Sequence, residues 1–152
     1  MKSLTKSQIV ETSGLTLRQV QFYTEEGLVI PEVEKGEGRG KTRKYSWTNL
    51  AHFLLIKELV DHGMTISKIR GILDYVRSNE TVNDYITKKM HQKGLKIFLI
   101  ISKREDGKTI IYWRGIPNTQ TASVLLADSD LNEIKSAIII NYTKLLMESE
   151  FS

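Results

Sequence analysis

The side chains whose types and spacing best suit contact with a partner lie in two neighbouring segments near the N-terminus. The candidate contact residues of the first segment are Thr16, Arg18, Gln19, Gln21 and Tyr23. The candidates of the second, glycine-rich segment are Arg39, Lys41, Arg43, Lys44 and Tyr45. Guanidinium and amide groups can pair with base edges, and cations can neutralise phosphates. Together the two segments predict a surface that binds double-stranded DNA.

The first segment needs a helix to hold its side chains, and the sequence predicts one. Thr5 with Gln8, and Thr16 with Gln19, have the spacing of capping boxes, so helices are expected from Thr5 to Ser13 and from Leu17 to Glu26. Gly14, between the two helices, can take the positive φ of a tight turn. This pattern is typical of a helix-turn-helix, in which the second helix enters the major groove.

The second segment is expected to form a hairpin over residues 32–45, around three glycines. Within residues 35–44, five bases stand against one acid, which favours contact with the DNA backbone or the minor groove. Ser46 and Thr65 then each cap a further apolar-faced helix. Residues 1–78 are therefore predicted to form a winged helix-turn-helix of four helices and a β-hairpin wing.

The second half of the chain has a different pattern. Residues 79–94 are expected to form a linker or short helix, and residues 95–152 a small β-β-β-α domain for dimerisation or effector sensing. Its predicted elements are strands at 96–103, 108–114 and 122–127, with an Asp106-Gly107 turn, and a helix from Leu131 to about Met147. The whole chain is thus predicted to be of the α+β class.

Composition narrows the possible functions. The 152 residues carry a net charge of +4, and no cysteine is present to supply a thiolate ligand or a disulfide. We expect no metal, no cofactor and no membrane segment, and a cytoplasmic location in a bacterial cell, associated with the nucleoid. No nucleophile, base and orienting group recur at a recognisable spacing, so the chain is not expected to be an enzyme.

Residues 5–77 resemble the MerR family of winged helix-turn-helix regulators. The resemblance rests on seven ordered segments, at residues 14–18, 22–23, 27–31, 43–46, 56–59, 63–66 and 69–73. It implies a transcriptional regulator that binds DNA as a homodimer, and a phosphate contact for Tyr23. Gln21 departs from the family's usual arginine and Thr24 from its usual acid, and only about 15 residues stand where the family has a long dimerisation helix.

Individual roles follow from residue chemistry. Arg18 can donate to guanine, and Gln21 can pair with adenine or contact the backbone. Tyr45 is expected either to hydrogen-bond the DNA backbone or to pack under the wing, and Phe22 to lie in the core. Three later bases are expected on the solvated surface, or in one case at a helix-end phosphate contact: Lys57, Lys68 and Arg70.

Three functions compete on these observations. The first is a sequence-specific transcriptional regulator with an unknown small-molecule or protein effector. The second is an excisionase-like accessory factor that bends DNA. The third is a winged-helix protein-interaction module without DNA binding, which the basic wing and Arg18 argue against. In the C-terminal half, Phe98, Tyr112 and Trp113 can line an apolar ligand pocket or serve as ordinary core. This half can also mediate dimerisation or dock another protein, and the broad apolar face of the predicted final helix favours dimerisation.

Overall fold

The computed structural model describes residues 3–32, 42–79, 95–117 and 133–145. Its contacts divide the chain into two compact units, Met1–Asp74 with Leu145–Ser152, and Tyr75–Lys144. Among the described residues, four helices precede a three-stranded antiparallel sheet and a short helical turn, so the predicted α+β class is confirmed. In the same residues no helix is long and apolar enough to cross a membrane.

The predicted helix-turn-helix is present in the N-terminal unit. Helix α1 (Lys6–Ser13) and helix α2 (Leu17–Glu25) both begin with the expected capping box, in which a threonine and a glutamine exchange hydrogen bonds. Gly14 lies between them in the left-handed conformation, with φ 67°. These local signals alone fix where each helix begins.

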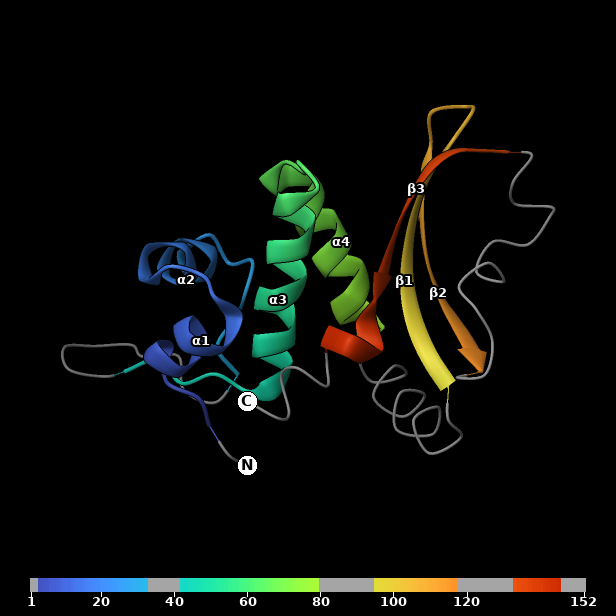
Figure 1. Ribbon diagram of the computed structural model, residues 1–152. Helices are drawn as coiled ribbons and strands as arrows, with labels where there is room; N and C mark the ends of the chain where they lie inside the picture. The colour runs from blue at the N-terminus through green and yellow to red at the C-terminus, as the bar shows by residue number, and fades with distance from the viewer. Residues whose placement is uncertain (1–2, 33–41, 80–94, 118–132, 146–152) are drawn as a thin grey trace. The chain divides into compact units, whose positions relative to one another are not determined.

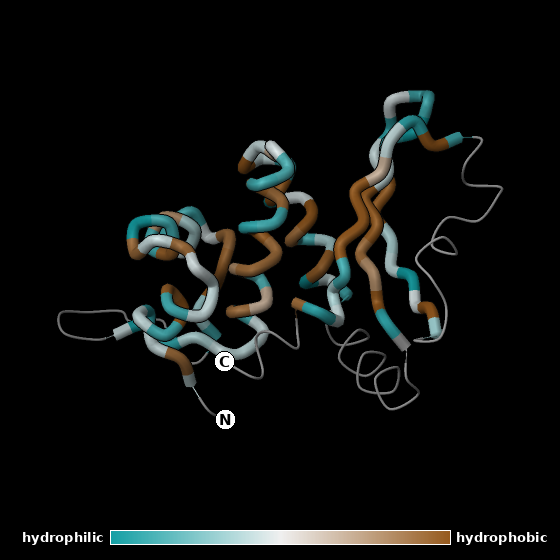
Figure 2. Tube along the Cα trace, viewed as in Figure 1, coloured by the Kyte–Doolittle hydropathy of each residue, from teal (hydrophilic) through white to brown (hydrophobic). Residues whose placement is uncertain are grey.

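Helix α3 (Trp47–Asp61) is the most buried helix of this unit. Nine of its 15 residues are buried, and it begins at Ser46, whose side chain accepts from the Asn49 amide. Helix α1 packs against both α2 and α3 (Figure 1). Figure 2 shows the hydrophobic run along α3 that forms this core. Helix α4 (Ile66–Ser78) follows directly after Thr65, as predicted.

The base of the wing is tied to the N-terminus of the chain. Leu4 and Tyr45 form an antiparallel bridge with two backbone hydrogen bonds, of 2.8 and 2.9 Å. The wing itself lies largely outside the described residues, since residues 33–41 are not among them. The bridge therefore fixes only where the chain leaves the wing and enters α3.

The second unit contains a sheet with strand order β2-β1-β3. Strand β1 (Leu95–Arg104) and strand β2 (Thr109–Pro117) form the predicted hairpin, with Gly107 at φ 82° in its turn. The central strand β1 is buried on both faces from Ile97 to Ser102. The hairpin prediction is confirmed. Strand β1 is one residue longer than expected at each end, and β2 begins one residue later and ends three residues later than expected.

The prediction of a long final helix is wrong at residues 134–141, which form a strand. Residues Ile134–Asn141 form strand β3, which pairs antiparallel with β1 and has a register shift between Lys103 and Arg104. Four of these eight residues are isoleucine, which packs well on a pleated surface and loses side-chain freedom in a helix. A helical turn begins only after Asn141, whose side chain accepts from the Lys144 amide at 3.1 Å. The strand predicted at 122–127 lies outside the described residues.

Candidate nucleic-acid interface

Helix α2 has one buried face and one solvent-exposed face. Val20, Tyr23 and Thr24 are buried. The solvent-exposed side chains of the helix are Leu17, Arg18, Gln21, Phe22 and Glu25. The helix therefore presents a mixed cationic, amide and apolar face, which is the combination that reads base edges in a major groove.

Phe22 corrects one expectation from the sequence. It was expected in the core, yet 43 % of its surface is exposed, and Leu17 is 55 % exposed on the same helix. The adjacent Tyr23 is the buried aromatic residue, and the two rings pack edge to face with centroids 5.6 Å apart. An exposed aromatic ring on this face can contact a thymine methyl group.

The N-terminus of α2 is closed by Thr16 and Gln19. Gln19 Oε1 accepts from the Thr16 amide at 2.8 Å and from the Thr16 hydroxyl at 3.0 Å, and Thr16 Oγ1 accepts from the Gln19 amide at 3.2 Å. Thr16 is exposed and Gln19 half-buried. Because these two side chains hydrogen-bond to each other's residue, their first role is to define where α2 begins.

Gln21 and Glu25 form a second pair, on the exposed side of α2. Gln21 Nε2 donates to Glu25 Oε1 at 2.8 Å. The two residues stand one turn apart, the separation at which side chains on a helix meet. The amide of Gln21 is therefore held in one place before any partner arrives.

Tyr23 lies in the packed interior beneath this face. Only 5 % of its surface is exposed. Burial, and after it the charge of Asp61, raises the pKa of the Tyr23 hydroxyl. These observations favour a packing role over the phosphate contact that the family resemblance implied.

Tyr45 is buried in the N-terminal unit, which favours the packing role expected for it over a contact with the DNA backbone. It has no exposed surface. Its hydroxyl lies 3.1 Å from Thr24 Oγ1, which also donates to the Val20 carbonyl at 2.8 Å, and its ring packs on Phe53 with centroids 5.6 Å apart. Tyr45 thus connects the chain just before α3 to the buried side of α2.

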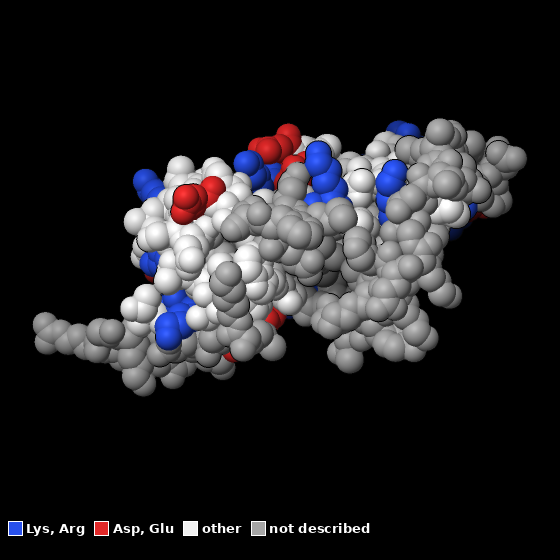
Figure 3. Space-filling view, turned by 60° about the horizontal axis from the view of Figure 1, so that its bottom comes forward, with Lys and Arg blue, Asp and Glu red and all other residues white. Residues whose placement is uncertain are grey.

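The predicted basic wing residues fall into two groups. Lys44 is exposed and Arg43 half-buried at the wing base, whereas Arg39 and Lys41 lie outside the described residues. Figure 3 shows basic and acidic side chains interspersed on the face it presents. The described residues on that face therefore form no continuous basic surface.

Asn49 is a positioning residue that sequence reasoning missed. It is 1 % exposed, and its Oδ1 accepts from the Glu32 and Ser46 amides, both at 3.1 Å. Its Nδ2 donates to the Ile30 carbonyl at 2.9 Å. One buried amide thus holds both ends of the wing, and its place three residues after the Ser46 cap was the available signal.

Two cations that the sequence predicts on the solvated surface instead donate to backbone carbonyls, one at the end of α1 and one at the end of α2. Lys57 Nζ of α3 donates to the Ser13 carbonyl at 3.1 Å, beside the turn that precedes α2. Arg70 Nη1 of α4 donates to the Glu26 carbonyl at 2.8 Å, at the end of α2. A cation at a helix C-terminus interacts favourably with the unpaired carbonyls there. Lys68, by contrast, is exposed as expected.

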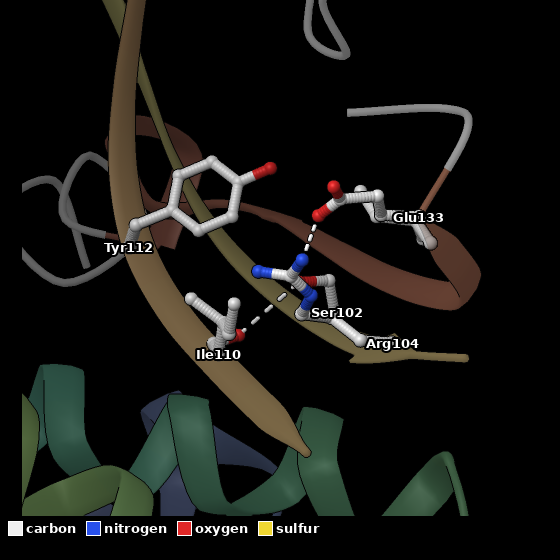
Figure 4. Close-up of a pocket in the computed structure, with 6 residues that line it drawn as sticks. Ser102, Arg104, Ile110, Tyr112 and Glu133 are labelled. Atoms are coloured by element: carbon white, nitrogen blue, oxygen red, sulfur yellow. Dashed lines mark hydrogen bonds and ion pairs between the residues drawn. The ribbon is translucent and has the colours of Figure 1, made fainter. Parts of the chain in front are cut away.

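The second unit contains a small open hollow on one face of its sheet, shown in Figure 4. Its volume is about 260 Å³, and it is lined by Ser102, Arg104, Ile110, Tyr112, Glu133 and Ile134. Arg104 and Glu133 form an ion pair across it (Figure 4). Tyr112 lines this hollow, as the pocket hypothesis expected.

The other two aromatic residues of that hypothesis do not line the hollow. Phe98 packs with Ile100 and Ile116, and Trp113 packs edge to face on Tyr142 with centroids 4.8 Å apart. Phe98 is thus a core residue, and Trp113 is half-buried. In the part of the chain that the structure describes, no cluster of three His, Cys, Asp or Glu side chains could hold a metal ion.

Comparison with known proteins identifies the family of the helix-turn-helix. Residues 4–76 match the model of the MerR HTH family regulatory protein. Residues 4–76 are a MerR-family helix-turn-helix domain. This MerR domain contains α1, α2, α3 and most of α4. The resemblance drawn from the seven sequence segments is confirmed.

Two curated relatives carry similar domains. The uncharacterized HTH-type transcriptional regulator Rv1830 of Mycobacterium tuberculosis is 26% identical over 100 residues, which cover 66% of this chain and 38% of the relative. The HTH-type transcriptional regulator GlnR of Bacillus cereus is 30% identical over 73 residues, which cover 48% of this chain and 53% of the relative. The matches thus span two fifths to about half of these relatives. Both relatives are named as HTH-type transcriptional regulators.

Proposed function

We propose that this protein is a sequence-specific transcriptional regulator that reads the major groove with α2 and contacts the adjacent backbone or minor groove with its basic wing. The observation that carries the proposal is the exposed face of α2. Its proposed contact residues, with Phe22 added, are Thr16, Arg18, Gln19, Gln21, Phe22, Arg39, Lys41, Arg43 and Lys44. Tyr23 and Tyr45 instead support α2 from its buried side.

We further propose that two copies bind one operator. A single α2 covers only a few base pairs, and helix-turn-helix proteins commonly gain affinity by placing two reading helices on two half-sites. The second unit is the proposed site of dimerisation or of effector input, because only 16 residues lie between the end of α4 at Ser78 and the start of β1 at Leu95, where the family has a long dimerisation helix. A small molecule or a protein can fill the effector role.

The decisive experiment is selection of binding sites from a random duplex pool with the purified full chain, repeated at two salt concentrations. We expect convergence on an inverted repeat, with affinity that falls steeply as salt rises. Salt-sensitive binding without convergence would favour the DNA-bending accessory factor. Absence of binding at both salt concentrations, with and without cell extract as a source of effector, would refute the proposal.

A further inference from the structure

The hydrogen bond between Gln21 and Glu25 determines which way the Gln21 amide faces. A carboxylate has only acceptor atoms, so Glu25 can be met only by the NH₂ group of the amide, as the 2.8 Å contact from Nε2 requires. The usual ambiguity between amide oxygen and nitrogen is thereby removed on chemical grounds. Gln21 Oε1 and the second Nε2 hydrogen remain available to a partner.

These two remaining groups match one base better than the others. Adenine presents an N6–H donor and an N7 acceptor in the major groove, which complement the amide oxygen and the amide hydrogen. Guanine presents two acceptors, O6 and N7, so the fixed Oε1 of Gln21 would face an acceptor. The orientation set by Glu25 therefore favours adenine over guanine.

The negative charge of Glu25 should weaken DNA binding, and this makes its role testable. It is exposed on the same face of α2 as Gln21 and Arg18. A carboxylate on a surface that approaches phosphates is repelled by them, so Glu25 should weaken binding to DNA of any sequence. Glu25 thus lowers the affinity for DNA in general, but it raises the selectivity for one base by orienting the Gln21 amide.

We propose that Glu25 is a positioning residue that makes Gln21 an adenine reader at one base pair of each half-site. The proposal rests on the proposed function, in that α2 must lie in the major groove. Gln21 makes the base contact, and Glu25 acts only through it. The ligand feature recognised is the N6–H and N7 edge of adenine.

The test measures dissociation constants of the full chain on duplexes that carry each of the four bases at every position of the selected half-site. The proteins are the wild type, Gln21→Ala, Glu25→Ala and the control Glu11→Ala, which removes the same charge from an exposed position on α1. We expect Gln21→Ala to lose the preference for adenine at one position. Glu25→Ala should reduce adenine-over-guanine selectivity at that same position by about tenfold, without weaker binding to random DNA. Glu11→Ala should leave the selectivity unchanged.

The remaining outcomes separate the two proposals. Full adenine selectivity in Glu25→Ala would overturn the positioning role, and so would a Gln21→Ala protein that keeps every base preference. A loss of cytosine preference at a different position in Glu25→Ala would also overturn it, because Glu25 would then be reading cytosine N4 directly. A wild-type protein without any base preference would instead refute the proposed function itself.

Discussion

Lys57 Nζ, on helix α3, lies 3.1 Å from the carbonyl oxygen of Ser13, the last residue of helix α1. The same ammonium group lies 3.0 Å from where a Cβ atom on Gly14 would stand. Lys57, from helix α3, therefore holds the backbone at the turn between α1 and α2. Arg70 acts similarly on the other end of α2, through the Glu26 carbonyl. Cations from later helices thus contact the backbone at the end of α1 and at the end of α2.

Replacing Lys57 with methionine should lower the free energy of unfolding by about 1–2 kcal/mol, because a charge-assisted hydrogen bond to the Ser13 carbonyl is lost. Urea denaturation measures this difference. Lys68→Met is the matched control, since it removes the same charge from an exposed position on α4. Equal stability of the two variants would contradict a role for Lys57 in closing the turn.

Gly14→Ala should destabilise the N-terminal unit by about 1–3 kcal/mol, because alanine is strained at φ 67°. Gly71→Ala is the control within the same unit. Gly71 lies in α4, has no positive φ, and an added Cβ would meet nothing within 4 Å. The Gly71→Ala variant should have a free energy of unfolding higher by up to about 1 kcal/mol, because alanine has the better helix propensity. Thermal unfolding should therefore give shifts of opposite sign.

Arg18→Ala and Lys41→Ala should affect DNA binding in different ways. Loss of Arg18 should cost about 1–3 kcal/mol on the selected operator and relax the preference at one position. Loss of Lys41 should weaken binding to all sequences alike and reduce the slope of affinity against salt by about one unit. Titrations on operator and random duplexes at several salt concentrations distinguish the two. An Arg18→Ala protein with full discrimination would remove Arg18 from the reading face.

Tyr45→Phe should reduce stability by about 1 kcal/mol, because the buried hydrogen bond to Thr24 is lost. The dissociation constant for operator DNA should stay unchanged under conditions where the variant is fully folded. Tyr45 has no exposed surface from which to touch DNA. A stable variant with weakened binding would return Tyr45 to the set of DNA contacts.

Tyr23 should make the stability of the N-terminal unit fall in alkaline solution. Burial, followed by the charge of Asp61, raises the pKa of Tyr23 in the folded protein. In the unfolded chain its pKa is about 10, so from there upward the unfolded state loses the proton first and unfolding becomes easier. The contribution is fully present below that pH and is lost as pH rises through the folded pKa. Denaturation of wild type and Tyr23→Phe from about pH 8 to about pH 10.5 checks this. The variant should lose less stability over that range, and parallel curves would refute the expectation.

The sequence by itself determined the helix-turn-helix, because its signals are local. Capping boxes at Thr5 and Thr16 and the glycine at position 14 act within four residues, so no tertiary contact is needed to read them. The Asp106-Gly107 hairpin was readable for the same reason. The family resemblance was likewise carried by short segments in fixed order.

Only the tertiary structure decided which side chains face a partner and which pack inside. Phe22 and Tyr23 are adjacent aromatic residues with the same local pattern, and only the packing around α2 buries the tyrosine and exposes the phenylalanine. The local sequence likewise does not decide the secondary structure of Ile134–Asn141, because its apolar residues fit a broad helix face or a strand. Pairing with β1 selects the strand. Lys57 and Arg70 find backbone carbonyls 44 residues away in sequence. Contacts of that separation depend on the fold and leave no local pattern to read.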